Sequence, residues 1–130
     1  MPTTYGVVVG HTYTVTEARA LLIDLMPVLD EIVALRADVA ELGTALRAGV
    51  PSRLGGLAEL KAAQARVDEL FTCVAGYDDI QLKGIAPLLL DFPAQLDGEQ
   101  VLLCWLEGDT GLEWYHRIDL GFAGRRRLNG

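Results

Sequence analysis

The sequence is poor in the residue types from which many functional sites are built. Of its 130 residues, two are cysteine and two are histidine. Two cysteines, Cys73 and Cys104, supply neither a disulfide framework nor a zinc ligand set. No apolar run approaches the roughly 18 residues of a membrane span, and Met1-Pro2-Thr3-Thr4 lacks the basic segment that opens a signal peptide. We therefore predict a cytoplasmic protein with reduced thiols, no membrane association, no metal site and no cofactor.

Positive charge is also scarce. The chain has 11 lysines and arginines against 18 aspartates and glutamates, which gives a formal net charge of −7 and a pI near 4.7. Such a surface repels nucleic acid, so we do not expect nucleic-acid binding. The exception is the run Arg125-Arg126-Arg127, which is either a local basic spot or a solvated tail.

The composition is that of a folded protein. Hydrophobic residues make up 51% and charged residues 22% of the chain, values that are ordinary for a globular domain. A chain of this length fits one domain, residues 1–130. Residues 1–12 read as an N-terminal arm in which Val7-Val8-Val9 has strand composition, so that the arm could either add an edge strand or fray.

Two helices are predicted in the first part of the chain. Thr14 and Glu17 have the spacing of a capping box, and they open a helix over residues 14–48 in which Pro27 should cause a kink rather than an end. Gly49-Val50-Pro51-Ser52 breaks this pattern, and a second helix follows over residues 52–75. Apolar residues recur at helical spacing in the first helix: Ala18, Leu22, Leu25, Leu29, Ile32, Leu35, Val39, Leu42 and Leu46.

The two helices should form a long antiparallel hairpin, because the connection between them is short. Leu21, Met26, Val28 and Val33 widen the apolar stripe of the first helix beyond what one partner helix covers. A second copy of the chain would bury this surplus in a four-helix arrangement. We therefore expect a homodimer.

From Leu82 the pattern alternates with the period of strands. A first strand should stop at Pro93, a second covers residues 101–106, and a third covers residues 112–118. Turn residues separate them, so residues 82–120 are predicted to be a three-stranded antiparallel β-meander. A turn and tail over residues 121–130 complete an α+β fold.

The register of the last two strands decides which side chains can meet. A four-residue loop, Gly108 to Gly111, places Trp105 opposite Trp114 and puts His116 on the same face as both tryptophans. Cys104 then lies on the other face, which excludes a site shared by Cys104 and His116. A loop of three or five residues would reverse this and place Cys104 opposite His116. We favour the four-residue loop because it collects the apolar residues on one face.

A candidate ligand site follows from this register. His116 could act as base, ligand or switch, with Asp91, Glu113 or Asp119 as a neighbouring carboxylate. The candidate residues are Asp91, Trp105, Trp114, His116 and Arg125. The structural interpretation is that the tryptophans are core, His116 is a satisfied buried histidine, and Gly121 to Arg125 is a turn. Cys104 and Cys73 read as buried apolar thiols.

These features resemble a bacterial domain-of-unknown-function family, number 2203. Members are similar in a capped helix start and in a C-terminal DFP…LCW…GFAGR pattern, and the likeness runs from about Tyr13 to Leu128. The order Trp114-Tyr115-His116 departs from the aromatic-Trp-His order of the family, and Gly108-Asp109 stands where Gly-Glu is usual. The resemblance implies an architecture and no activity. The residues that carry it are Thr14, Glu17, Ala18, Leu21, Leu22, Asp91, Phe92, Pro93, Gly98, Val101, Leu103, Cys104, Trp105, Gly108, His116, Gly121, Phe122, Gly124 and Arg125.

Two functions are compatible with the sequence. The first is a non-enzymatic interaction module that self-associates through its helical hairpin. The second is a small ligand-binding or enzymatic domain that uses His116, Asp91 and Arg125 beside a Trp105–Trp114 wall, with a small anionic ligand.

Overall fold

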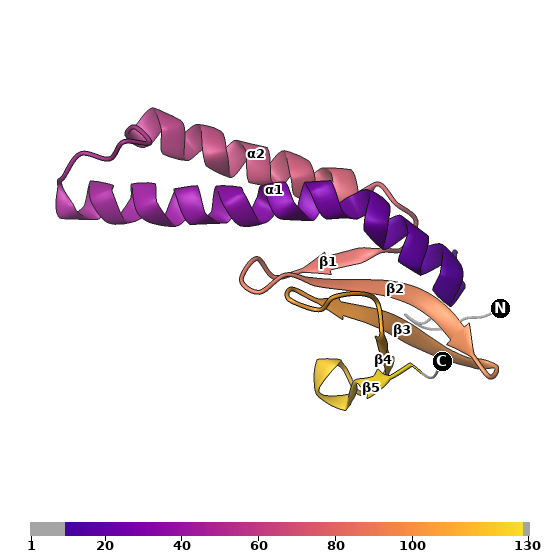
Figure 1. The fold of residues 1–130 in the computed structure, drawn as a ribbon. Helices are drawn as coiled ribbons and strands as arrows, with labels where there is room; N and C mark the ends of the chain where they lie inside the picture. Colours follow the sequence, from indigo (N-terminus) through magenta and orange to yellow (C-terminus); the bar gives the residue numbers. More distant parts are fainter. Residues whose placement is uncertain (1–9, 129–130) are drawn as a thin grey trace. The chain divides into compact units, whose positions relative to one another are not determined.

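The computed structural model describes residues 10–128 and divides into two compact units (Figure 1). One unit contains the chain up to Asp24 and from Val74 onward, and the other contains Leu25–Cys73. The fold is α+β, as predicted, with two helices and one antiparallel sheet. The expected strand at Val7 to Val9 lies outside the described residues.

Helix α1 spans Val15–Ala48 and begins with the predicted capping box. The Glu17 N–H donates to Thr14 Oγ1 at 3.0 Å, and the Thr14 N–H donates to Glu17 Oε1 at 2.9 Å. These two bonds satisfy backbone donors that the first turn leaves without helical partners. The helix runs through Pro27 without ending there, and the kink at this residue stays a prediction.

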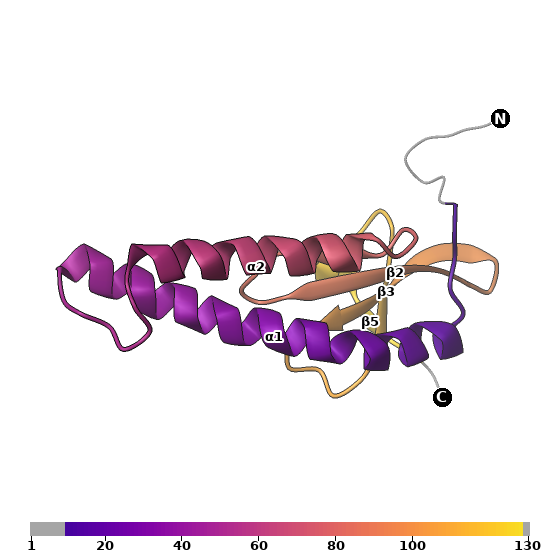
Figure 2. The same ribbon diagram turned by 90° about the horizontal axis from the view of Figure 1, so that it is seen from above.

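Helix α2 spans Leu57–Ala75 and runs beside α1 in the second unit, as Figures 1 and 2 both show. Its start is five residues later than predicted, because Ser52 and Gly55 form a tight turn in which the Gly55 N–H donates to the Ser52 carbonyl at 3.2 Å. Glu59 then caps the helix by accepting from the Gly56 N–H at 2.8 Å. Among the buried apolar side chains of the hairpin are Leu29, Ile32, Leu42, Val67 and Leu70.

The sheet has five strands rather than the three expected, in the spatial order β1-β2-β3-β4-β5. The central strands are β2 (Leu89–Leu96), β3 (Glu99–Leu106) and β4 (Trp114–Arg117). The strands missed by the sequence patterns are β1 (Gln81–Lys83) and β5 (Arg126–Arg127) at the two edges. Strands of two and three residues are too short to show an alternating pattern, which explains why they were missed.

The β2–β3 hairpin closes through the predicted turn at Asp97 and Gly98. Both residues have positive φ, 53° and 79°, which is the conformation of a type I′ turn that matches the twist of the flanking strands. Leu96 pairs directly with Glu99 across it. This turn sets the register of Asp91 against Cys104.

The expected end of a strand at Pro93 is wrong, since β2 continues to Leu96. Proline cannot donate to a sheet ladder, so it needs a position where no neighbour requires its N–H. Strand β1 pairs with β2 only from Leu89 to Asp91, whereas Pro93 pairs with Leu102 of β3 on the other side. The Pro93 carbonyl instead accepts from the Tyr13 N–H at 2.7 Å.

The predicted register of the last two strands is also wrong. Cys104 pairs with Trp114 and Leu102 pairs with His116, a shift of one residue from the expected pairing of Trp105 with Trp114. The chain between β3 and β4 is longer than a four-residue loop because Asp109 folds it back: its carboxylate accepts from the Leu106 N–H at 2.9 Å, and its carbonyl accepts from Trp105 Nε1 at 3.1 Å. A one-residue shift moves every side chain of β4 to the opposite face.

None of the described helices has the length and apolar character needed to cross a bilayer.

The capping box predicts a measurable contribution to stability. Replacing Thr14 with Ala removes the Oγ1 acceptor, so we expect the free energy of unfolding to fall by about 1 kcal/mol. Thr16→Ala is the matched control, since Thr16 is exposed in the first turn of α1; it should change stability by less than about 0.5 kcal/mol. Equal losses in the two variants, measured by urea unfolding, would contradict the role of the cap.

Candidate functional site

The observed register gathers polar side chains on one face of the sheet. Asp91 of β2 pairs with Cys104 of β3, and Cys104 pairs with Trp114 of β4, so these three side chains form a row on the same face. His116 lies two residues beyond Trp114 and therefore also shares this face. The opposite face carries Leu90, Phe92, Leu103 and Trp105 among the buried residues.

The N-terminal segment of the same unit packs on the apolar face of the sheet through Tyr13. The Tyr13 ring meets the Phe92 ring edge to face, with centroids 5.9 Å apart, and the Tyr13 hydroxyl donates to the Asp78 carbonyl at 2.7 Å. Along β2, side chains alternate between the apolar face, which Tyr13 contacts, and the face that holds Asp91.

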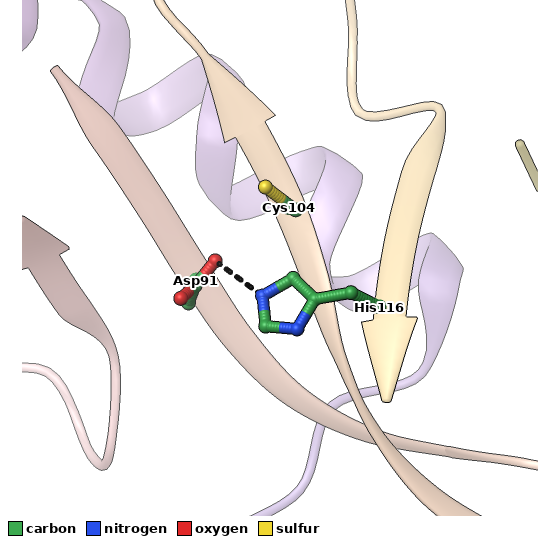
Figure 3. Close-up of side chains that lie close together, drawn as sticks. All are labelled: Asp91, Cys104 and His116. Atoms are coloured by element: carbon green, nitrogen blue, oxygen red, sulfur yellow. Dashed lines mark ion pairs between the residues drawn. The ribbon is translucent and has the colours of Figure 1, made fainter. Parts of the chain in front are cut away.

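The side chains of Asp91, Cys104 and His116 lie close together, as Figure 3 shows. Their candidate ligand atoms all lie within 4.8 Å of one another. Asp91 is 2% exposed, Cys104 is fully buried and His116 is 3% exposed. We call these three residues the Asp–Cys–His cluster.

The His116 imidazole and the Asp91 carboxylate have defined neighbours. His116 Nδ1 lies 2.9 Å from the Arg117 carbonyl oxygen, and His116 Nε2 lies 3.6 Å from Asp91 Oδ1. The second carboxylate oxygen, Asp91 Oδ2, accepts from the Lys83 ammonium at 2.8 Å. Lys83 itself is half exposed, so it links the buried carboxylate to the surface.

Arg125 closes the cluster on the side of Cys104. One of its guanidinium nitrogens lies 4.0 Å from Cys104 Sγ, and its fork binds the Asp109 carboxylate at 3.0 and 3.2 Å. The guanidinium also lies 4.4 Å from the centre of the Trp114 ring and 4.9 Å from that of Phe122. This combination of a bidentate ion pair and ring stacking suits arginine and not lysine.

The turn that carries Arg125 depends on two glycines. Gly121 has a φ of 65°, a region that favours glycine. A side chain on Gly124 would place its Cβ 2.6 Å from the Cβ of Leu120. Between them, Phe122–Gly124 forms a short 3₁₀ helix that presents Phe122 to the guanidinium.

The cysteine of the cluster is a weak nucleophile. Burial, and then the negative charge of Asp91, raise the pKa of the Cys104 thiol to about 11, although Arg125 acts in the opposite direction. The reactive form of cysteine is the thiolate. The geometry of a cysteine, a histidine and a carboxylate is present, but a nucleophilic role would need a lowered pKa and access to solvent.

The structure brings together part of the predicted site. Asp91 and His116 meet, and Arg125 lies beside them through Cys104. The Trp105–Trp114 wall does not exist, because Trp105 pairs with Leu90 and lies on the other face. The exclusion of a site shared by Cys104 and His116 is also wrong, because it depended on the shifted register.

Three participants were not predicted from sequence. Cys104 was interpreted as a buried apolar thiol, and neither Lys83 nor Asp109 was proposed as part of the site. The same interpretation of Cys73 is wrong, because Cys73 is exposed. The sequence does contain a signal for Cys104. A two-residue turn at Asp97-Gly98 is enough to pair Asp91 with Cys104 across the hairpin. Nothing local to Lys83 marks it, since its role arises from an edge strand of three residues.

The arginine triplet is largely consumed by intramolecular pairs. Arg125 binds Asp109, and Arg127 binds Glu113 at 2.7 Å. Arg126 is exposed and pairs along the ladder with Tyr115. The segment therefore acts as a clamp on the sheet, in agreement with the structural interpretation of this turn.

The clamp predicts unequal effects of two conservative substitutions. Arg125→Lys loses the fork on Asp109 and the stacking on Trp114, so we expect the free energy of unfolding to fall by about 1.5–3 kcal/mol. Arg127→Lys, at a residue whose side chain is 64% exposed, should cost less than about 0.5 kcal/mol. Similar losses in both variants, measured by denaturant unfolding, would contradict the role assigned to Arg125.

The burial of Cys104 predicts its reactivity. With iodoacetamide at pH 8, the exposed Cys73 should be alkylated quickly, whereas Cys104 should react only after unfolding, because it is buried and its pKa is raised. Mass spectrometry of tryptic peptides resolves the two sites. Alkylation of Cys104 at the rate of Cys73 in the folded protein would point to an accessible nucleophile instead.

Comparison with known proteins agrees with the resemblance found in the sequence. Residues 11–128 match the model of domain of unknown function 2203, whose description is "Uncharacterized conserved protein (DUF2203)". No match was found among curated proteins or among solved structures. The match covers the helices, the sheet and the Asp–Cys–His cluster, and the chain belongs to the domain-of-unknown-function family 2203.

Proposed function

We propose that this chain is a non-enzymatic interaction module that self-associates through its helical hairpin. The observation that carries the proposal is a group of large apolar side chains exposed at the closed end of the hairpin. Leu46, Val50, Leu54 and Leu57 are 42%, 55%, 37% and 59% exposed. These four aliphatic side chains, the apolar patch, lie within twelve residues of one another in the sequence, and exposed apolar surface of this kind favours protein–protein contact.

A groove lies beside this patch. It has a volume of about 620 Å³, and its lining combines apolar and polar side chains. Protruding leucines beside a groove form a surface that a two-fold related copy can complement, because each copy offers both features. The lining residues are Ala40, Glu41, Thr44, Ala45, Val50, Pro51, Ser52 and Arg53.

The apolar stripe of α1 continues this surface along the hairpin. Val33, Leu35 and Val39 are only half-buried, and Val33 is one of the residues that widen the apolar stripe of this helix. The helices are held to one another by their buried apolar residues and by the Glu31–Arg66 ion pair at 2.8 Å. The hairpin therefore offers a preformed surface, and a partner would not need to order it.

The burial of the cluster favours this function over the enzymatic alternative. Asp91, Cys104 and His116 are at most 3% exposed, so a substrate has no surface at which to reach them. The Arg125 fork, which was expected to receive a small anion, is occupied by Asp109. Catalysis on a substrate needs accessible groups, and this sheet offers buried ones.

The proposal predicts a concentration-dependent dimer that substitution at the patch weakens. Burying a valine or leucine contributes about 1.5–3 kcal/mol, so Val50→Asp and Leu57→Glu should each raise the dimer dissociation constant at least about tenfold. Size-exclusion chromatography with light scattering over a range of concentrations measures this constant.

Ile118→Glu is the matched control, since Ile118 is 37% exposed but lies outside the hairpin. This variant should dimerise as the unchanged chain does. A chain that stays monomeric at millimolar concentration, or a dimer that Ile118→Glu weakens as much as Leu57→Glu does, would overturn the proposal.

A further inference from the structure

The cluster on the sheet has the composition and arrangement of a metal site. Asp91 Oδ1, Cys104 Sγ and His116 Nε2 come from three adjacent strands, β2, β3 and β4, and point into the same space (Figure 3). We propose that these three residues bind one divalent transition-metal ion, with Zn²⁺ as the best fit. The site lies in the sheet and does not depend on self-association of the hairpin.

The imidazole is oriented as a ligand. A carbonyl oxygen can only accept, so the short contact of His116 Nδ1 with the Arg117 carbonyl, 2.9 Å, places the proton on Nδ1. The lone pair of the neutral ring is then on Nε2, which faces Asp91 Oδ1 at 3.6 Å. A backbone carbonyl that fixes the outer nitrogen is the usual support of a metal-bound histidine.

The carboxylate supplies an independent observation. Asp91 Oδ1 is the buried side-chain atom of the described residues that has no hydrogen-bond partner. A buried acceptor without a donor is costly, and the 3.6 Å separation from His116 Nε2 is too long for a hydrogen bond. Two acceptors that face each other across a buried gap are both satisfied by a cation between them.

The donor types select the class of ion. A thiolate and an imidazole favour Zn²⁺ and other borderline or soft transition metals, whereas Mg²⁺ and Ca²⁺ prefer sites made of oxygen. Tetrahedral zinc with ordinary bond lengths sets its ligand atoms about 3.3–3.6 Å apart. The donor atoms here lie within 4.8 Å of one another, so closing onto an ion requires movements of roughly 1 Å.

Charge and protons balance at this site. On binding, the Cys104 thiol releases one proton to solvent and its sulfur forms a bond to the ion, with no change of oxidation state. The thiolate and the Asp91 carboxylate then neutralise the two positive charges. Lys83 holds the other carboxylate oxygen, and the Arg125 guanidinium is placed 4.0 Å from the sulfur to stabilise the thiolate. Three protein donors leave one tetrahedral position for a water molecule.

Titration of the full, metal-free chain with Co²⁺ tests the proposal, because Co²⁺ takes zinc sites and its thiolate bond absorbs in the near ultraviolet. We expect one equivalent to bind with this absorption and Zn²⁺ to displace it. Cys104→Ser should abolish the thiolate absorption, and Asp91→Asn should weaken binding at least about tenfold. Cys73→Ser is the matched control, since Cys73 is exposed, and it should behave as the unchanged chain does.

Nuclear magnetic resonance of the unchanged chain gives a second measurement that no folding defect can confuse. On addition of Zn²⁺, the Nε2 resonance of His116 should shift strongly, while those of His11 should not. Absence of stoichiometric Co²⁺ binding, thiolate absorption that persists in Cys104→Ser, or an unmoved His116 resonance would each overturn the metal site. None of these results bears on whether the hairpin dimerises.

Discussion

The pairing of β3 with β4 is the constraint on which the rest of the sheet depends. Because Cys104 pairs with Trp114, one face receives Asp91, Cys104 and His116, and the other receives the apolar residues around Phe92. A shift by one residue would move His116 away from Asp91 and expose polar groups to the apolar face. The two residues of the Asp97-Gly98 turn fix the first half of this arrangement, and Asp109 fixes the second.

The C-terminal clamp holds that pairing in place. Arg125 reaches back to Asp109, in the connection whose fold determines the register, and stacks on Trp114, the partner of Cys104. One side chain therefore joins the connection, the strand and the cluster. The turn that precedes Arg125 contains two glycines for separate reasons. It needs a positive φ at Gly121, and it has no room for a side chain at Gly124.

Local chemistry made much of the fold predictable from the sequence. The Thr14–Glu17 box, the apolar spacing of both helices and the Asp97-Gly98 turn each act over a few residues, and all three are present. The candidate site was only partly predictable, because it depends on a connection whose length is set by Asp109 through bonds to Leu106 and Arg125. No local pattern reports such bonds.

Burial favours a different proposed task for each of the two parts of the chain. The hairpin presents apolar side chains outward at its closed end, whereas the sheet turns its most reactive groups inward. An exposed apolar patch favours contact with another protein, and a closed set of nitrogen, sulfur and oxygen donors favours an ion. The proposed module therefore combines a hairpin for association with a sheet that has its own binding centre.

Both the cluster and its chemistry depend on the β3–β4 register, and the most direct test measures that register. Cross-strand backbone proton contacts in nuclear Overhauser spectra report which residues face one another. The account predicts contacts between Cys104 and Trp114 and between Leu102 and His116. Contacts between Trp105 and Trp114 would place His116 and Cys104 on opposite faces and contradict it.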